Sequence, residues 1–225
     1  MSVEFVFDFD RAHRTGIEEA VLCSGKSVAQ IAAILQAVRE RSARVLLTRL
    51  SGQQAAELVD GFDLDYDEVS RTAFFGDVPE RTGSAEVGIV PAGTSDVPVA
   101  REAERTLRYY GVGARSYLDI GVAGLWRLGR WLSELESHRV IIVVAGMDGA
   151  LPSVIGGLLG GLVIAVPVST GYGMSRNGET ALHAALASCA PGVVVVNIDN
   201  GYGAAIAALR ALGATGRSVG NRDEA

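Results

Sequence analysis

The feature that most constrains the fold is a series of five apolar runs in the second half of the chain, separated by segments with helix-like patterning. The runs are Glu86–Pro91, Ser116–Leu118, Val140–Ala145, Leu162–Pro167 and Val193–Ile198. Strands that alternate with helices are joined by right-handed crossovers into a parallel sheet covered on both faces. We therefore expect an α/β fold, a three-layer, doubly wound parallel sheet of the flavodoxin-like kind.

Short glycine-rich or polar clusters follow four of these runs. The clusters are Ala92–Asp96, Gly146–Gly149, Ser169–Gly173 and Asn197–Gly201. In open parallel sheets, ligands collect in the crevice at the carboxyl ends of the strands. Because all four clusters belong to that edge, we expect them to form one binding site.

The N-terminal third is more polar and carries a pattern of its own. Ser27 and Gln30 fit a capping box at the start of a helix, since apolar residues follow at helical spacing. These apolar residues are Val28, Ile31, Ala32, Leu35 and Val38. Beyond this helix, the pattern predicts strands at Val45–Leu47 and Thr72–Phe75 and a helix at Gln53–Val59.

A polar run, Gly76–Ala85, separates this N-terminal pattern from the regular second half. We take it as the boundary between a small N-terminal α/β domain at 1–82 and a larger domain at 83–225. Within the smaller domain, the charged segment Asp8–Glu19 shows no clean periodicity and receives no assignment.

The composition narrows the class of protein. With 225 residues, 48% of them hydrophobic, the chain can bury a sizeable core, which excludes a fully disordered protein. The net charge is −6 and the basic residues are scattered, so nucleic-acid binding is not expected. The apolar stretch Val154–Val168 is broken by glycine pairs and is shorter than the ~20 residues of a membrane helix. Without signal-peptide features at its start, the chain is expected to be cytoplasmic and to bind no membrane.

Two cysteines are too few for a disulfide framework or a four-ligand zinc site. Cys189 follows the helix-like run Glu179–Ser188. A free cysteine at such a position is by default buried and inert. A helix C-terminus does not lower the pKa of a thiol, so the position alone does not activate it. Cys23 lies near Lys26, which would favour a thiolate, although an incidental thiol is the preferred reading. No metal-like spacing links the histidines His13, His138 and His183, so no protein metal site is expected.

The cluster after the first apolar run has two readings. Thr94 or Ser95 fits the cap of a helix that begins near Pro98, and the free amides at that helix end suit a phosphate or a carboxylate. Asp96 fits an acid that faces the helix dipole. From this cluster alone, a plain helix cap is the preferred interpretation.

Asp148 follows the apolar run Val140–Ala145 directly. Partial desolvation there would raise the proton affinity of its carboxylate and suit a general base. An N-cap for a helix at Ala150–Leu159 is an equally good reading.

Five stretches of the second half together resemble one family. They are GTSDVPVAREA (Gly93–Ala103), DIGVAGLWRL (Asp119–Leu128), VVAGMDGALPSVIGGL (Val143–Leu158), GYG (Gly171–Gly173) and SCAPGVVVVNIDNGYGAA (Ser188–Ala205). They resemble the pyridinium-3,5-biscarboxylic acid mononucleotide synthases of nickel-pincer cofactor biosynthesis, the LarB family of the PurE-like carboxylase superfamily. Arg14–Glu19 and Gly25–Lys26 match this family more weakly. The resemblance implies a PurE-like fold for 83–225 and a homo-oligomer, either an octamer or a tetramer.

The resemblance also implies a reaction, in which nicotinic acid adenine dinucleotide, carbon dioxide and water give the biscarboxylated mononucleotide and AMP. It implies that Cys189 adds to the pyridinium ring, that Asp148 removes the C5 proton and that Asp96 is a further catalytic residue. The substrate contacts that it implies are Thr94, Ser95, Gly146, Gly149, Ala150, Leu151, Tyr172, Asn197 and Asn200. No tightly bound cofactor is expected, and Mg²⁺ is expected to arrive with the substrate phosphates. Asp199 fits either an assisting carboxylate or a loop former.

Two departures and two rival functions accompany the resemblance. The chain has Met174–Gly178 where the family usually has a Phe-Gly-Gly-like stretch, and Asp148 where members often carry Glu. One rival is an aminoimidazole ribonucleotide carboxylase, although the loop histidine of those enzymes is replaced by Gly149 and Ala150. The other is a non-catalytic nucleotide-binding module that uses its helix ends alone.

Overall fold

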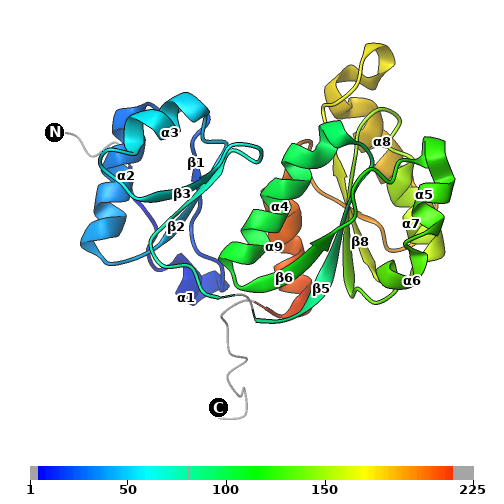
Figure 1. Cartoon of the computed structure of the whole chain (residues 1–225), viewed down its shortest axis with the longest axis horizontal. Coiled ribbons are helices and arrows are strands. Elements are labelled where there is room, and N and C mark those ends of the chain that lie inside the picture. Colours follow the sequence, from blue (N-terminus) through cyan, green and yellow to red (C-terminus); the bar gives the residue numbers. More distant parts are fainter. Residues whose placement is uncertain (1–4, 81, 215–225) are drawn as a thin grey trace, which may run out of the picture. The chain divides into compact units, whose positions relative to one another are not determined.

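The structure is a computed structural model that describes residues 5–80 and 82–214. The chain divides into two compact units (Figure 1). The first unit holds the described residues up to Val78 together with Gly213 and Ala214, and the second holds Pro79–Leu212.

The N-terminal unit is a four-stranded sheet in the order β1-β2-β4-β3 with short helices. Its elements are α1 (Arg11–Thr15), β1 (Val21–Leu22), α2 (Val28–Glu40), β2 (Val45–Thr48), α3 (Gly52–Leu58), β3 (Leu64–Asp67) and β4 (Thr72–Phe75). β1 is parallel to β2, whereas β4 is antiparallel to both of its neighbours. The unit is therefore a mixed α/β layer with its own core.

The predicted capping box at Ser27 and Gln30 is confirmed, since each side chain bonds to the backbone amide of the other residue. Helix α2 buries the predicted Ile31, Leu35 and Val38 together with Ile34, whereas the predicted Val28 and Ala32 are half-buried. The predicted helix at Gln53–Val59 and both predicted strands are present within one residue at each end. Strands β1 and β3 and helix α1 were not predicted, because they are short and only partly buried.

The second unit is a five-stranded, all-parallel sheet in the order β6-β5-β7-β8-β9. Its strands are β5 (Thr82–Pro91), β6 (Val112–Ser116), β7 (Val140–Ala145), β8 (Leu162–Pro167) and β9 (Val194–Val195). Its helices are η1 (Thr94–Asp96), α4 (Val97–Tyr109), η2 (Val122–Gly124), α5 (Leu125–Gly129), α6 (Leu132–Leu135), α7 (Leu151–Leu158), η3 (Gly173–Gly178), α8 (Glu179–Leu186) and α9 (Gly201–Leu212). The first strand of this unit lies between the second and third, which is the flavodoxin-like order. The predicted fold class is confirmed.

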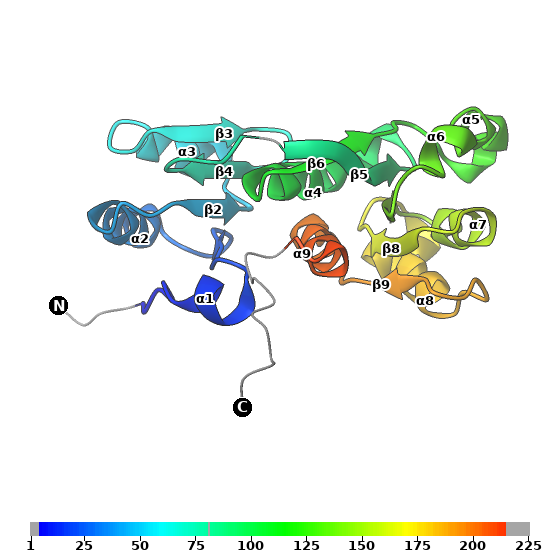
Figure 2. The same ribbon diagram turned by 90° about the horizontal axis from the view of Figure 1, so that it is seen from below.

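Helices cover both faces of this sheet, as Figure 2 shows. α4 and α9 pack against each other on one face, and α5 to α8 lie on the other. Ile141, Val143 and Ala145 of β7 point into the core under α5 to α7, while the alternate residues of the strand are buried on the opposite face. This two-sided burial explains why the strand reads as a continuous apolar run.

Two of the predicted strand positions are wrong. The second strand is Val112–Ser116 rather than Ser116–Leu118, because Tyr117 is buried as a core residue just beyond the strand. The last strand is only Val194–Val195, because it is the edge strand and pairs with β8 alone. An apolar run in the sequence indicates which residues are buried. Buried residues can continue beyond the last hydrogen-bonded residue of a strand, so the run does not fix where the strand ends.

His138, which lies just before β7, connects this strand to β5 and to Tyr117, the residue that follows β6. Its Nδ1 lies 2.8 Å from the Ala85 carbonyl oxygen and therefore donates, so its Nε2 accepts from the Tyr117 hydroxyl at 2.7 Å. Burial lowers the pKa of His138, which keeps the ring neutral in the fold. A Cβ on Gly88 would lie 2.7 Å from this ring, so the ring fills space that only glycine leaves free.

No helix in the described parts of the chain is long and apolar enough to cross a membrane.

Candidate active site

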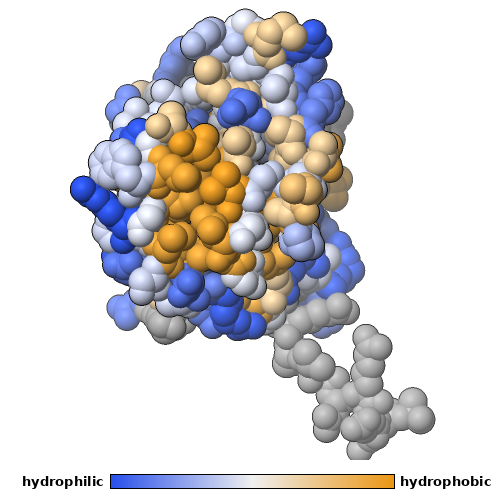
Figure 3. All heavy atoms as spheres, turned by 90° about the vertical axis from the view of Figure 1, so that its right-hand side faces the viewer, coloured by the Kyte–Doolittle hydropathy of each residue, from blue (hydrophilic) through white to orange (hydrophobic). Residues whose placement is uncertain are grey.

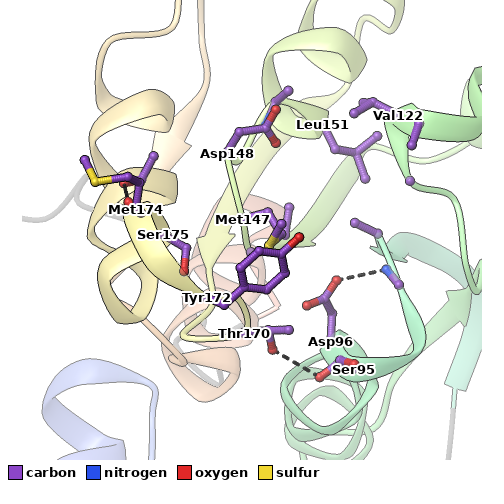
Figure 4. Close-up of a pocket in the computed structure, with 18 of the residues that line it drawn as sticks. Ser95, Asp96, Val122, Met147, Asp148, Leu151, Thr170, Tyr172, Met174 and Ser175 are labelled. Atoms are coloured by element: carbon purple, nitrogen blue, oxygen red, sulfur yellow. Dashed lines mark hydrogen bonds between the residues drawn. The ribbon is translucent and has the colours of Figure 1, made fainter.

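A cavity of about 740 Å³ opens at the carboxyl ends of β5, β6, β7 and β8 (Figure 4). Its lining residues come from the four loops after these strands and from the start of α8: Ala92, Gly93, Ser95, Asp96, Gly121, Val122, Ala123, Ala145, Gly146, Met147, Asp148, Ala150, Leu151, Thr170, Tyr172, Gly173, Met174, Ser175 and Thr180. The cavity lies where the strand order reverses, next to β5 and β7. Ligands bind at this point in doubly wound sheets.

Gly146 allows the loops after β7 and β8 to meet at the floor of the cavity. A Cβ on this residue would lie 2.3 Å from the Thr170 carbonyl oxygen, which is backbone and cannot swing aside. The same carbonyl accepts a hydrogen bond from the Met147 amide at 3.1 Å. Glycine is therefore required here by the close approach of two chain segments.

Asp96 is a buried carboxylic acid in the cavity wall, with 5% of its surface exposed. Its Oδ2 accepts a hydrogen bond from the Gly93 amide at 2.8 Å, whereas its buried Oδ1 has no hydrogen-bond partner among the described residues. Burial raises the pKa of Asp96, the Gly93 amide and the nearby Thr170 hydroxyl oppose this, and the carboxylate of Asp199 raises it further. Asp96 is thus suited to donate or accept a proton in the cavity.

The helix-cap reading of this loop is wrong. Neither Thr94 nor Ser95 caps α4 with its side chain. A 3₁₀ turn at Thr94–Asp96 leads into the helix instead, and Asp96 closes that turn through the Gly93 amide.

Asp148 lies at the cavity mouth and is exposed. The expected desolvation of its carboxylate is wrong, because Met147 adopts a left-handed conformation with φ 54° and turns the chain off the end of β7. Its Oδ1 accepts only a long hydrogen bond, 3.4 Å, from the Ala150 amide, and helix α7 has no side-chain cap. The carboxylate is therefore free to turn toward a ligand.

The rest of the wall is apolar or aromatic. Tyr172, Met147 and Met174 are exposed side chains of the wall, whereas Val122 is half-buried and Leu151 is buried (Figure 4). The described lining residues include two carboxylates and no lysine, arginine or histidine. The cavity therefore favours a flat, neutral or positively charged group over an anion.

The loop after β8 has an unusual backbone. Arg176 and Asn177 both adopt left-handed conformations, with φ 47° and 54°, inside the 3₁₀ segment Gly173–Gly178. This is the stretch in which the sequence departs from the family that it resembles. The loop places Met174 and Ser175 on the cavity wall, while the side chain of Arg176 does not line it.

Seven of the residues expected at the site line the cavity: Ser95, Asp96, Gly146, Asp148, Ala150, Leu151 and Tyr172. Five do not: Thr94, Gly149, Asn197, Asn200 and Cys189. In place of the cluster after β9, the loop after β6 contributes Gly121–Ala123. That loop lies in the DIGVAGLWRL stretch, but no polar side chain there marked it as part of a site.

The cluster after β9 shapes loops instead of lining the cavity. Asn200 Oδ1 accepts from the Gly203 amide at 2.7 Å at the start of α9, and Asp199 Oδ1 accepts from the Ser169 amide at 2.8 Å. Asn197 bonds to the amide of the next residue, Ile198. Gly149 has a packing role, because a Cβ there would meet the Ala181 backbone at 2.7 Å.

Cys189 is exposed and lies outside the cavity lining, so the reading as a buried thiol is wrong. Its loop is fastened to the side of α7. Ser188 Oγ lies 2.7 Å from Ser153 Oγ, and a Cβ on Gly156 would approach the Cβ of Ala190 to 3.1 Å. Within one chain, the thiol is therefore not part of the wall that carries Asp96.

Cys23 is fully buried, and burial raises its pKa to about 12 despite the nearby Lys26. It is the inert thiol of the pair, in agreement with the preferred reading. Among the described residues, no group of three or more His, Cys, Asp and Glu side chains is placed to hold a metal ion.

Comparisons with known proteins agree with this architecture. Residues 86–223 match the AIR carboxylase family, and residues 4–77 match the LarB/PurE-like N-terminal domain. An uncharacterized protein of Methanocaldococcus jannaschii is 40% identical over 208 residues, which cover 88% of this chain and 80% of that protein. The N5-carboxyaminoimidazole ribonucleotide mutase of Pyrococcus horikoshii is 33% identical over 131 residues, 56% of this chain and 72% of the mutase.

A crystal structure of PurE from Treponema denticola is also similar, with a TM-score of 0.48 and 21% identity over 56% of this chain and 79% of that one. The family match covers more than half of the sequence and includes every strand of the parallel sheet except the start of β5. The chain therefore belongs to the AIR carboxylase family and carries a LarB/PurE-like N-terminal domain.

Proposed function

We propose that this protein carboxylates the pyridinium ring of nicotinic acid adenine dinucleotide at C5 and releases AMP, as the first step of nickel-pincer nucleotide biosynthesis that serves lactate racemase maturation. The AIR carboxylase and LarB/PurE-like matches support a carboxylase-type enzyme. The charge of the cavity is the observation that favours a pyridinium ring over an aminoimidazole ring as the group to be carboxylated.

A pyridinium ring is flat and positively charged, whereas an aminoimidazole ring is neutral. The cavity offers Asp96 and Asp148 as carboxylates, the face of Tyr172 as a stacking partner, and no basic side chain among its described lining residues. Cation–π attraction and carboxylate charge both favour the cationic ring. The single-chain cavity thus suits the pyridinium ring, while the ring's carboxylate at C3 has no basic partner among the described lining residues.

The chemistry requires that an electron-poor ring become nucleophilic at C5. Addition of a thiolate to the neighbouring ring carbon gives a dihydropyridine whose enamine places electron density on C5, and C5 then forms a bond to carbon dioxide. A base removes the C5 proton, the carbon–sulfur bond breaks, and the thiolate leaves as aromaticity returns. Water attack on the phosphoanhydride separately releases AMP.

Two carboxylates can handle the C5 proton, and the geometry gives them different roles. Asp148 is exposed at the mouth and free to approach the ring, so we assign it as the base. Asp96 is buried with an unpartnered oxygen, so we assign it to hold a proton near the new carboxylate.

Cys189 remains our proposed nucleophile, supplied to the cavity by a second copy of the chain. Its exposed thiol does not line the cavity of its own chain. Figure 3 shows a wide apolar area on the face of the second unit that carries α5 and α7, where Leu125 and Leu158 are exposed. A face of this kind is typical of subunit contacts, which supports a homo-oligomer.

The phosphate groups of the dinucleotide need charge compensation that the cavity lacks. The described residues form no cluster of acidic or imidazole ligands for a metal ion. We therefore propose that Mg²⁺ binds to the substrate phosphates and arrives with them, where it supplies charge neutralisation during release of AMP.

A second candidate is carboxylation of aminoimidazole ribonucleotide, which the match to the AIR carboxylase family favours. The ring of that substrate is neutral, so it gains less from the two carboxylates and from the face of Tyr172 than a cationic ring does. The two reactions share a fold and differ in the charge of the ring.

The direct test incubates the protein with nicotinic acid adenine dinucleotide, bicarbonate and Mg²⁺ and follows products by mass spectrometry. We expect a mononucleotide with one added carboxylate, formed together with AMP. Asp148→Asn and Cys189→Ala should each lower turnover by about 100-fold or more while the protein still binds the substrate.

Glu136→Gln is the matched control for Asp148→Asn, because Glu136 is exposed in the same unit and lies outside the cavity. Absence of product from the unaltered protein would reject the reaction. Full turnover by Cys189→Ala would remove the covalent step.

A further inference from the structure

The N-terminal unit has a cavity of its own, about 410 Å³, at the edge where its parallel strands β1 and β2 end. The residues that line it are Ser24, Gly25, Lys26, Ser27, Val28, Arg49, Ser51, Gln53, Gln54, Glu57 and Arg71. They belong to the loops that lead from β1 into α2 and from β2 into α3, and to the turn before β4. Because β4 is antiparallel to β2, the residue that precedes β4 lies at this same edge.

The cavity concentrates positive charge in a chain whose net charge is −6. Each of its three segments contributes one cation: Lys26, Arg49 and Arg71. Neither Lys26 nor Arg71 forms an ion pair with any residue in the described part of the chain. The one acid in the lining, Glu57, accepts a hydrogen bond from Gln53 at 3.1 Å.

The three segments are held together by hydrogen bonds. Gln54 Nε2 donates to the Lys26 carbonyl at 2.9 Å, which ties the first loop to the start of α3. The Leu50 amide donates to the Arg71 carbonyl at 2.8 Å, which ties the second loop to the turn. Arg49 and Arg71 both adopt left-handed conformations with φ 54°, which arginine rarely does without a structural or functional reason.

We propose that this cavity binds the phosphate group of a small phosphorylated ligand of nucleotide size. Lys26 and Arg71, which form no ion pair with the described residues, match the charge of a phosphate monoester better than that of a single carboxylate, and a guanidinium group binds phosphate oxygens in pairs. Gly25 has no neighbouring atom within 4 Å of where a Cβ would be, so an anion can approach its backbone closely. An extended polyanion is disfavoured by the acidic remainder of the chain and by the size of the cavity.

Lys26 provides a specific readout, because it is the only lysine in the sequence. The full chain is treated with an amine-acetylating reagent, and acetylation of Lys26 is followed by peptide mass spectrometry. AMP, the probe, should slow this reaction about tenfold at saturation, inorganic phosphate should do so at higher concentration, and adenosine should not. Equal protection by adenosine, or none by AMP at millimolar concentration, would overturn the proposal.

Variants test whether the cluster acts as one site. Arg71→Gln should weaken the protection of Lys26 by AMP about tenfold. Arg11→Gln removes the same charge from an exposed residue of the same unit, outside the cavity lining, and should leave the protection unchanged.

Equal effects of the two variants would overturn the site, as would stronger protection by a single-stranded RNA than by AMP. The readout is local to Lys26 and does not depend on carboxylation. Failure of this proposal is therefore distinguishable from failure of the proposed function.

Discussion

At the scale of single residues, the two carboxylates of the cavity show how burial divides roles between identical side chains. Asp96 and Asp148 both follow strands of the same sheet, yet one is buried with a raised pKa and the other is exposed. The difference comes from the backbone, since a 3₁₀ turn directs Asp96 inward and a left-handed Met147 turns Asp148 outward. In the proposed reaction, the buried Asp96 would hold a proton and the exposed Asp148 would act as the base.

The two thiols should differ sharply in reactivity. With a pKa of about 12, Cys23 is almost entirely protonated at pH 8, and its side chain is fully buried. Cys189 is exposed. Timed alkylation of the folded protein with iodoacetamide should modify Cys189 at least ~100-fold faster than Cys23, as peptide mass spectrometry can measure.

Alkylation of the protein unfolded in urea is the control, because both thiols should then react at similar rates. The dinucleotide substrate should also slow alkylation of Cys189 if that thiol reaches a cavity in the assembly. Comparable rates in the folded protein would contradict the placement of Cys23 in the core.

The neutral state of His138 predicts a pH dependence of stability. Because burial lowers its pKa in the fold, the unfolded chain binds a proton near pH 6.5 that the folded chain does not bind. The free energy of unfolding should therefore fall as the pH drops below about 6.5, by at most ~1.4 kcal/mol per pH unit from this group. Urea unfolding at pH 8 and pH 5.5 measures it.

His138→Gln serves as the comparison, since it removes the titrating group. The variant should be less stable at pH 8 but should lose less stability on acidification. An identical pH dependence in both proteins would show that His138 is not the group responsible.

At the scale of elements, the sequence predicts the bounds of a helix or strand correctly where its apolar residues are also the buried ones. The strands Val140–Ala145 and Leu162–Pro167 are predicted to the residue, because both faces of each strand are buried and the apolar run equals the strand. The capping box of α2 is also predicted correctly, because it involves only residues that are close in the sequence. β6 and β9 are displaced or shortened, since pairing at a sheet edge depends on neighbours that a local pattern does not contain.

The candidate site, too, is predicted in part: some of its loops are recognisable from the sequence and others are not. Loops after β5, β7 and β8 are recognisable from their small and polar residues, and each lines the cavity. The loop after β6 was not expected there, because its apolar residues Val122 and Ala123 look like core. Cys189 was misplaced from sequence, since a helix C-terminus reads as a buried position, whereas the structure exposes the thiol outside the cavity lining.

Gly146 provides a test of how tightly the loops must meet. Gly146→Ala would place a Cβ 2.3 Å from the Thr170 carbonyl oxygen, so the loops must separate. We expect a loss of stability of about 1–3 kcal/mol and at least a tenfold loss of carboxylation. Thermal unfolding and turnover measure the two effects.

Gly157→Ala is the matched control, because it lies on α7 where no atom is within 4 Å of an added Cβ. It should raise stability slightly through helix propensity. If Gly146→Ala behaved in the same way, the close approach at the floor of the cavity would not be a constraint.

At the scale of the whole molecule, the proposal joins a cavity on one chain to a thiol on another. This arrangement predicts complementation between inactive variants. In a mixture of Asp96→Asn and Cys189→Ala chains, some cavities combine an intact Asp96 with an intact Cys189 from a neighbour. After subunit exchange, an equal mixture should recover about a quarter of the activity of the unaltered protein.

Recovery should be absent when either variant is mixed with the double variant, which checks that exchange alone restores nothing. Failure to recover activity, with exchange shown by native mass spectrometry of chains that differ in isotopic mass, would contradict a site shared between copies.

The central claim is that the cavity selects a positively charged pyridinium ring for carboxylation. The most direct measurement gives the protein equal amounts of nicotinic acid adenine dinucleotide and aminoimidazole ribonucleotide with ¹³C-bicarbonate and Mg²⁺, and follows which product takes up the label. We predict one ¹³C carboxylate in the pyridinium mononucleotide for each AMP released, and no label in the imidazole product. Label in the imidazole nucleotide alone would contradict the account and assign the protein to carboxylation of aminoimidazole ribonucleotide, the reaction that its family name describes.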